Sequence, residues 1–431
     1  MTHKQGLFLS LFFIFSAFTS YAQPYVEGGN TRHRFAQMTV GAELTYRPSG
    51  GNGRFIENGQ TQDFAFPDRL QPRLSIGGTH FWGHCEFYVS FPLGNLLSEA
   101  ISENSEIASS SGIETALKIY PWRLERKKVR PFLGSGMSVP NWRLTQEEER
   151  GAYLSKTIVP LMGGLTYQRG NLLYELGGRY RLGRDQAYYL DRSQSTIFQQ
   201  PRFSLFAGVR WQLETTLSAE EPYLDGRTDA VVEYLKKNKK LSAFSLAVGP
   251  SSTFFLLPER STYNDAERPY LSEHKGSNVF PEFGLGYYHY PSDAHLNLSY
   301  RSYASFISAY GYQQRIARRA FTLEAYKFLF DYHGFVPFIG PFISWDRWSL
   351  RESDQGTLVN DQTKQHVLPG LTFGWDIRPN DAQWFILRTN LRYNPSIFQT
   401  SDDTQLFLHH LEFNFIQLVI YPGRWRAFRG K

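Results

Sequence analysis

The side chains that could catalyse a reaction or bind a metal are scattered through this sequence. Its 431 residues include eleven histidines, of which His80 and His84 flank Gly83 and His409 and His410 are adjacent. A metal site normally takes three or more protein ligands, and neither pair has a third beside it. A lipid hydrolase would need a serine and a histidine supported by a carboxylate or an amide, and no such set stands out. The sequence predicts no catalytic residue, no metal site and no cofactor.

Charged residues of both signs instead recur at alternate positions between apolar ones. In residues 38–46, for example, Met38, Val40 and Leu44 alternate with Thr39 and Glu43. A period of two predicts strands with one apolar and one polar face. On the polar faces we predict a network of charges, made of Glu43, Glu86, Glu175, Arg179, Arg181, Arg210, Glu282, Glu324, Arg388, Arg392 and Glu412.

Strands with this alternation fall into two groups of eight. The first group is predicted at 33–47, 71–82, 84–93, 113–122, 130–144, 156–169, 171–182 and 200–213. The second is predicted at 241–257, 278–290, 294–306, 319–333, 335–348, 365–378, 383–395 and 407–421. Tight turns alternate with long polar loops, among them 48–69, 94–112, 145–155, 307–318 and 351–364. Short turns at one end and long loops at the other are typical of transmembrane β-barrels.

The two groups share a repeated phrase. "VRPFLGSG" at 129–136 is answered by "FVPFIGPF" at 335–342, an offset of 206, and other matches keep offsets up to 213. Such self-similarity predicts a tandem duplication of an eight-stranded unit. We therefore predict a first barrel unit at 23–213, a linker with a short helix at 214–240 and a second unit at 241–431.

The first residues predict export. A basic start, the apolar stretch "GLFLSLFFIFSAF" and small residues before Gln23 indicate a cleaved signal peptide at 1–22. The rest of the chain has no apolar run of about 20 residues, which excludes membrane-spanning helices. Cys85 is the single cysteine, so no internal disulfide can form. The net charge of +6 is spread along the chain and does not indicate nucleic-acid binding.

One hairpin resembles a known family. "ALKIYPWRLERKKVRPFLGSG", residues 116–136, is similar to the hairpin between the fourth and fifth strands of OmpA/OmpX-like outer-membrane β-barrels of Gram-negative bacteria. The matching positions are Lys118, Tyr120, Pro121, Arg130, Pro131, Phe132, Gly134 and Gly136, and the second copy has diverged to Glu324 and Phe342. The resemblance implies an outer-membrane location, contact with outer-membrane lipid and lipopolysaccharide, and assembly by the barrel-assembly and periplasmic chaperone machinery. An envelope protein partner stays unidentified.

Aromatic residues cluster at strand ends, as an interfacial girdle requires. We predict that girdle at Trp82, Trp122, Trp211, Trp345, Trp375, Trp384 and Tyr421.

The fold class is therefore an all-β, antiparallel, up-and-down transmembrane barrel of about sixteen strands. The 27-residue linker favours two eight-stranded barrels over one barrel of sixteen. Two narrow barrels would be filled by side chains, leaving the external loops for surface contact or envelope architecture without enzymatic activity. One wide barrel would be a diffusion pore for small hydrophilic solutes, and an outer-membrane lipid hydrolase is a further alternative.

Overall fold

The computed structural model describes residues 36–430, apart from 94–96, 125–126, 147–148, 156, 184, 215–225, 257–260, 278, 333 and 379–381. The predicted signal peptide, residues 1–22, lies outside the described residues, and so do residues 215–225 of the predicted linker. No helix in the described ranges is long and apolar enough to cross a membrane.

Sixteen wall strands form two separate closed barrels, which confirms the predicted fold class and the preference for two barrels over one. The first barrel consists of β1 (Gln37–Arg47), β4 (Arg69–His80), β5 (Cys85–Pro92), β8 (Glu114–Ile119), β9 (Val129–Ser138), β12 (Pro160–Arg169), β13 (Leu172–Arg181) and β16 (Phe203–Glu214). The second consists of β17 (Ala243–Phe255), β18 (Phe280–His289), β19 (Ala294–Ala309), β20 (Tyr312–Phe328), β21 (Phe335–Asp354), β22 (Thr357–Ile377), β23 (Phe385–Asn394) and β26 (His410–Ile420).

Each ring closes on its own half of the chain. In the first barrel β1 pairs with β16, and in the second β17 pairs with β26, so the first and last strands of each unit meet. A single sixteen-stranded ring would require β16 to pair with β17, but β16 is already occupied on both sides by β1 and β13. The one-barrel alternative is therefore wrong.

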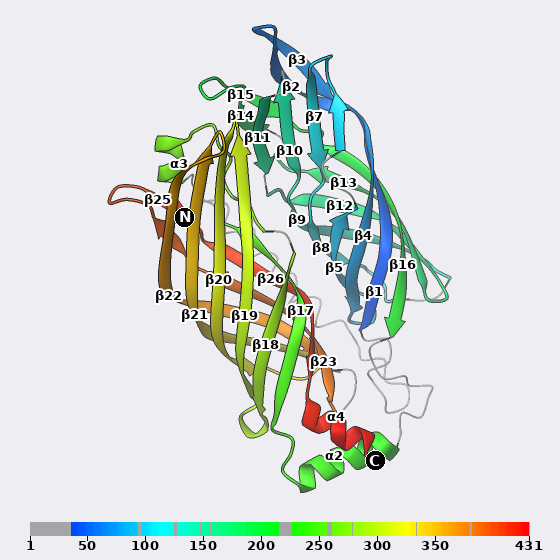
Figure 1. The fold of residues 1–431 in the computed structure, drawn as a ribbon. Helices are drawn as coiled ribbons and strands as arrows, with labels where there is room; N and C mark the ends of the chain where they lie inside the picture. Colours follow the sequence, from blue (N-terminus) through cyan, green and yellow to red (C-terminus); the bar gives the residue numbers. More distant parts are fainter. Residues whose placement is uncertain are drawn as a thin grey trace, which may run out of the picture.

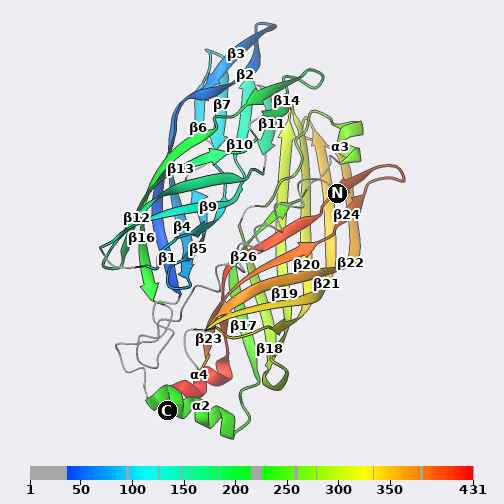
Figure 2. The same cartoon turned by 180° about the vertical axis from the view of Figure 1, so that it is seen from behind.

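The two barrels lie side by side and pack against each other through aromatic residues (Figures 1 and 2). On the covered walls, Phe87 of β5 lies edge-on to Phe413 of β26 with ring centroids 5.3 Å apart, and Phe91 lies 5.6 Å from Phe415. Nearer the short-turn end, His80 and Phe81 contact Phe335. The outward apolar face of each barrel thus has two environments, one against the partner barrel and one exposed.

Beyond the first barrel the chain forms two small sheets where long loops were predicted. One sheet contains β14 (Asp185–Tyr189), β15 (Ser195–Gln199), β2 (Gly50–Glu57) and β3 (Gln60–Phe66). The other contains β11 (Glu149–Ser155), β10 (Asn141–Gln146), β7 (Ser105–Ser110) and β6 (Leu97–Ala100). We call these eight strands the external layer. Phe66, Trp142 and Phe198 form its aromatic core, with Phe66 and Trp142 4.7 Å apart.

The external layer begins at a break in the barrel wall. The predicted strand 130–144 is divided into β9 and β10 at Pro140, which has no N–H for the strand ladder. Beside it, in the gap between β7 and β8, Gly112 has a φ of +66°, and a Cβ there would lie 1.6 Å from the Val139 carbonyl oxygen. Both features sit where the wall bends, so β7 and β10 leave the barrel together.

The second barrel has no such break in three of its strands. β20, β21 and β22 are 17, 20 and 21 residues long and rise to the height of the external layer (Figure 1). The predictions of long loops at 307–318 and 351–364 were therefore wrong: tight turns at Tyr310–Gly311 and Gln355–Gly356 connect continuous strands. Gly311 and Gly356 supply the positive φ values, +79° and +81°, that such turns require.

Two helices cover the short-turn end of the second barrel (Figure 1). The described part of the linker contains α2 (Gly226–Lys237), and α4 (Pro422–Arg429), which was not predicted, follows the last strand. Val231 and Leu235 of α2 are buried against Ala427 and Phe428 of α4. Two further short elements, α3 (Thr262–Glu267) and a hairpin of β24 (Ile397–Gln399) and β25 (Gln405–Phe407), lie at the external end.

Candidate functional site

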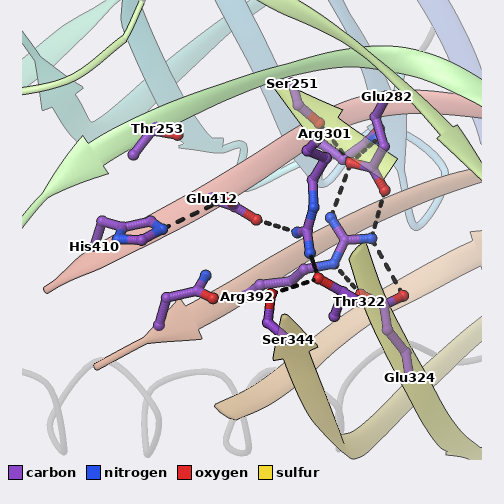
Figure 3. Close-up of polar contacts among 12 residues, drawn as sticks. Ser251, Thr253, Glu282, Arg301, Thr322, Glu324, Ser344, Arg392, His410 and Glu412 are labelled. Carbon is purple, nitrogen blue, oxygen red and sulfur yellow. Dashed lines mark hydrogen bonds and ion pairs between the residues drawn. The ribbon is translucent and has the colours of Figure 1, made fainter. Parts of the chain in front are cut away.

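The inside of the second barrel is filled by charged side chains that pair across it (Figure 3). Arg392 of β23 donates to both carboxylate oxygens of Glu282 on β18, at 2.7 and 2.9 Å, and it also binds Glu324 of β20. Glu324 accepts a further hydrogen bond from Asn297 at 3.0 Å. All four side chains are buried. The bonds of Arg392 connect β23 with β18 and β20, which are not its neighbours in the ring, so they cross the lumen.

A second group of charges in this barrel surrounds Glu412 of β26. Arg301 of β19 and Arg318 of β20 both donate to it, and β20 lies on the opposite side of the ring from β26. Arg318 also holds Asp346 with two bonds of 2.7 and 2.9 Å. Removing one member of a buried charge pair leaves the other uncompensated, at a cost of about 3–5 kcal/mol. The lumen is therefore closed by interactions that are costly to open.

The first barrel is filled by a similar but less uniform network. Arg179 of β13 donates to Glu43 at 2.7 Å and to Glu114 at 2.9 Å. Lys118 of β8 binds Glu175 of β13, while its ammonium lies 4.4 Å from the ring centroid of Tyr88. Further contacts link Arg210 with Glu86 and Glu175, and Tyr120 with Glu86. Both lumens thus carry paired charges enclosed by aromatic rings.

All eleven residues of the predicted charge network are buried inside the barrels. Glu43, Glu86, Glu175, Arg179 and Arg210 meet in the first barrel, and Glu282, Glu324 and Arg392 meet in the second. Arg388 pairs with Asp376 rather than with another predicted member, and Arg181 forms no ion pair with any described residue. The predicted network left out further buried charges that obey the same alternation, among them Arg73, Glu114, Lys118, Arg301, Arg318, Asp346 and Asp376.

The predicted aromatic girdle is only partly an exposed ring. Trp122, Trp211 and Trp345 are exposed on the outer surface, and Trp384 stacks on Trp425 of α4 at a 22° interplanar angle.

The prediction of an exposed girdle was wrong for Trp82, Trp375 and Tyr421. Trp82 contacts Tyr332 and Trp375 contacts Phe87, because the partner barrel covers that wall. Tyr421 is 2% exposed and faces inward. An extra residue of β26 between Asn414 and Gln417 shifts the register and reverses the alternation beyond it.

Histidines that sequence reasoning considered lie in buried or structural positions. His80 packs against Phe335 and Trp375 between the barrels, and His84 bonds the Tyr120 carbonyl oxygen through Nδ1 at 3.1 Å. His410 is buried beside Glu412. Cys85 is buried as well. In the described part of the chain, no three histidine, cysteine or acidic side chains are grouped to hold a metal ion.

Among the described residues, two buried serine–histidine contacts lie inside the second barrel, and a third, between His289 and Ser292 at 2.7 Å, lies in the exposed short turn after β18. His274 bonds Ser305 at 2.9 Å and Gln314 at 3.1 Å, and His295 bonds Ser245 at 3.1 Å. The side chains of the two contacts inside the barrel are all buried. A lipid hydrolase would need its nucleophile on the outward wall, where acyl chains can reach it, so this geometry does not supply that chemistry.

The external layer connects the first barrel to the second outside the walls. Arg192, in the turn between β14 and β15, donates to Asp354 at the tip of β21 at 2.7 Å. Arg192 also donates to the Tyr310 carbonyl oxygen, and the Tyr310 hydroxyl donates to the Tyr189 carbonyl oxygen at 2.6 Å. Leu271 and Tyr312 join the buried cluster around Trp142. Polar bonds and a shared buried cluster therefore hold the external layer against the ends of β19, β20 and β21.

Comparison with known proteins gives only low similarities. No family model and no curated protein matches the sequence. Among solved structures, Neisserial surface protein A is 16% identical, with 41% of this chain and 97% of that chain covered at a TM-score of 0.26. The N-terminal β-barrel domain of Pseudomonas aeruginosa OprF is 13% identical, covering 41% and 99% at 0.24. OmpT of Vibrio cholerae is 8% identical, covering 90% and 98% at 0.17.

Since these TM-scores are low, the class of the protein rests on its own geometry. The chain forms two closed antiparallel barrels with polar, charge-paired interiors. Their outward faces expose apolar residues such as Leu133, Leu176, Phe283 and Ile343. Closed rings leave no unpaired strand edge for the bilayer core, and outward apolar residues match its hydrocarbon. These features define a transmembrane β-barrel of the outer-membrane type.

Proposed function

We propose that this chain is a non-enzymatic integral outer-membrane protein. Two closed barrels anchor it, and it presents its external layer for surface contact or envelope architecture. The observation that carries the proposal is the set of ion pairs across both lumens, such as Arg318 with Glu412 and Arg179 with Glu114. Breaking a buried pair costs about 3–5 kcal/mol, so the lumens offer no ready path for solutes. Activity then belongs to the parts outside the membrane.

We also infer that the two barrels are copies of one OmpA/OmpX-like eight-stranded unit. The repeated phrase supports this inference, because Pro131 lies near the start of β9 and Pro337 near the start of β21. β9 and β21 are each the fifth wall strand of their barrel. The copies keep strand number and closure while their external parts differ.

The orientation follows from the chain's layout. Barrels of this class keep short turns in the periplasm and long connections outside. That rule assigns the turns at Gly83 and Gly170, together with α2 and α4, to the periplasm. It assigns the external layer to the cell surface. The export signal predicted at 1–22 and the assembly of the barrels by the envelope machinery are parts of the same proposal.

Conductance of the full-length protein in a planar bilayer tests the closed lumens. We expect no stable current steps, with a general porin in the same lipid as the positive control. Steps of hundreds of picosiemens would contradict the proposal and favour the diffusion pore.

Protease treatment of intact cells tests the orientation. We expect cleavage in the external layer, for example at residues 51–65 or 191–194. The segment 226–240 should be cut only after the outer membrane has been permeabilised. Cleavage of 226–240 on intact cells would reverse the proposed orientation.

A further inference from the structure

Four exposed arginines stand together on the outward face of the second barrel. Arg315 and Arg319 belong to β20, and Arg347 and Arg351 belong to β21. The strand register places Arg319 directly opposite Arg347 and Arg315 directly opposite Arg351. Like charges that face each other across an antiparallel pair destabilise it. We call these four residues the outward arginine cluster.

The chain itself does not neutralise this cluster. Within the described residues, none of the four guanidinium groups forms an ion pair. Arg315 makes a cation–π contact instead, with its guanidinium carbon 5.3 Å from the centroid of the Phe306 ring. Asp361 is opposite Arg351 in the register, yet no ion pair joins them. Arg318, one position from Arg319, shows the contrast, since it is buried and bound to two carboxylates. Two repulsive pairs without internal compensation indicate an external anion.

The position of the cluster identifies the source of that anion. The next outward pair toward the periplasm is Phe321 with Trp345, followed by Leu323 with Ile343, and all four side chains are exposed. The apolar belt therefore ends immediately below Arg319 and Arg347. An exposed tryptophan at that boundary is typical of the level where hydrocarbon gives way to headgroups. The arginines face the headgroup layer of the outer leaflet.

The spacing of the cluster suits a headgroup with two separated phosphates. Arg319 lies four positions after Arg315, which is about 14 Å along an antiparallel strand. Each pair presents two guanidinium groups side by side, and a guanidinium binds phosphate oxygens with two parallel hydrogen bonds. On the flanking strands, Ser302 lies opposite Arg319 and Gln365 lies opposite Arg347, and both are uncharged and polar. They leave room for a sugar phosphate without adding competing charge.

We propose that the outward arginine cluster binds the phosphates of a bis-phosphorylated glycolipid of the outer leaflet, the lipid A portion of lipopolysaccharide. The proposal rests on the proposed outer-membrane function, since that membrane places such a lipid against this face. Bound phosphate also removes the repulsion between Arg319 and Arg347. The cluster then fixes the depth of the second barrel in the outer leaflet.

The test measures binding of bis-phosphorylated lipid A to the purified full-length protein in detergent by native mass spectrometry. The variant combines Arg319→Gln with Arg347→Gln. The matched control combines Arg426→Gln with Arg429→Gln, which removes the same charge from exposed positions of α4 at the other end. Loss of charge-assisted bonds should weaken lipid A binding of the variant about tenfold or more. The control should bind as the unchanged protein does.

Two further probes separate the lipid from other anions. The unchanged protein should bind dephosphorylated lipid A at least tenfold more weakly, and millimolar inorganic phosphate should not displace lipid A. Equal binding of phosphorylated and dephosphorylated lipid would overturn the inference, as would equal binding by variant and unchanged protein. Displacement by free phosphate would overturn the assignment to a lipid.

Folding is monitored in the same samples by heat-modifiable migration on detergent gels. Without lipid, the variant should unfold at the same temperature as the unchanged protein or higher, because a repulsive pair has been removed. If that variant fails to fold, Arg315→Gln with Arg351→Gln replaces it and should show the same loss. Conductance distinguishes the lipid A site from the closed-lumen function proposed above. If the bilayer shows no current but the protein binds phosphorylated and dephosphorylated lipid A equally, only the lipid A site is overturned. Channel activity overturns only the closed-lumen function.

Discussion

Above the membrane belt, the first barrel bends away from its own wall, whereas three strands of the second continue straight upward. In the first barrel Gly112 and Pro140 interrupt neighbouring strands, and the chain beyond them forms the external layer. In the second, β20, β21 and β22 keep one unbroken register with their neighbours through most of their length. Gly112 and Pro140 therefore interrupt strand pairing in the first barrel, so that its chain continues as separate sheets. The second barrel, where β20, β21 and β22 are uninterrupted, continues as longer wall strands.

The lumens differ in the chemistry that neutralises their charges. The second barrel relies on bidentate pairs between arginine and carboxylate, as in Arg388 with Asp376 at 2.7 and 2.9 Å. The first barrel includes Lys118, whose ammonium lies 4.4 Å from the Tyr88 centroid and 4.8 Å from that of Phe132. Bidentate pairs are geometrically more specific than contacts of a point charge. We therefore expect the second lumen to respond more strongly to loss of one carboxylate.

The largest expected effect is from Glu412→Gln, which would leave Arg301 without a carboxylate partner among the described residues, while Arg318 would keep Asp346. We expect a loss of about 3–5 kcal/mol in the free energy of unfolding. Glu114→Gln in the first barrel should cost less, because Arg179 keeps Glu43 at 2.7 Å. Urea unfolding in lipid vesicles, followed by tryptophan fluorescence, measures both variants. Equal losses would remove the proposed difference between the lumens.

The covered and lipid-facing walls of the second barrel can be compared with Phe413→Ala and Phe373→Ala. Phe413 is buried against Phe87 of the other barrel, and its truncation should cost about 3 kcal/mol through lost packing and a residual cavity. Phe373 is 46% exposed, and lipid chains can fill the space it leaves, so about 1 kcal/mol or less is expected. The same urea measurement applies. A larger loss for Phe373 would show that the barrels do not pack as described.

The external ends can be compared with Gly112→Ala and Gly356→Ala. Both glycines have positive φ, but a Cβ at Gly112 would meet the Val139 carbonyl oxygen, whereas at Gly356 it would meet open space. We expect a loss of about 2 kcal/mol or more at Gly112 and about 1 kcal/mol at Gly356. Protease resistance of the external layer should fall only for Gly112→Ala. A fall for both variants would contradict the special role of the bend.

The smallest effect concerns pH and the contact between the external ends. The hydrogen bond from Arg192 lowers the pKa of the Asp354 carboxyl below its usual value, with burial opposing that shift. A lowered folded-state pKa contributes stability above the unfolded pKa of about 4, and that contribution disappears as pH falls through the folded value.

Asp354→Asn should therefore lower the melting temperature slightly at pH 7 and not at pH 2. Asp361→Asn, another exposed acid on the same hairpin, is the control and should show no such difference. A constant effect of Asp354→Asn at both pH values would contradict the ion pair.

Much of the fold could be read from alternation alone. A period of two fixed the direction of Glu43, Glu282 and Arg392 without knowledge of their partners, because strand side chains point to opposite faces. The repeated phrase at 129–136 and 335–342 lies in the fifth wall strand of each barrel, β9 and β21. The same rule failed at Tyr421, since a single extra residue in β26 reverses the faces and leaves no mark in the sequence.

The contacts outside the lumens were beyond such reasoning. Phe413 and Phe373 are both apolar residues of outward type, yet one packs against a protein wall and the other is exposed. Hydrophobicity alone cannot distinguish a lipid from another barrel. The strands of the external layer are rich in polar residues and glycine, so residues 50–66 had the composition of a loop while forming a hairpin.

The closure of each ring within its own half makes the strand pairing of one barrel independent of the other. Every pairing partner in the first ring lies between Gln37 and Glu214, so that ring has all its strands before any residue of the second is needed. Contacts confined to a shorter stretch of chain reduce the loop entropy that folding must overcome. Either barrel can therefore close its ring without pairing with a strand of the other.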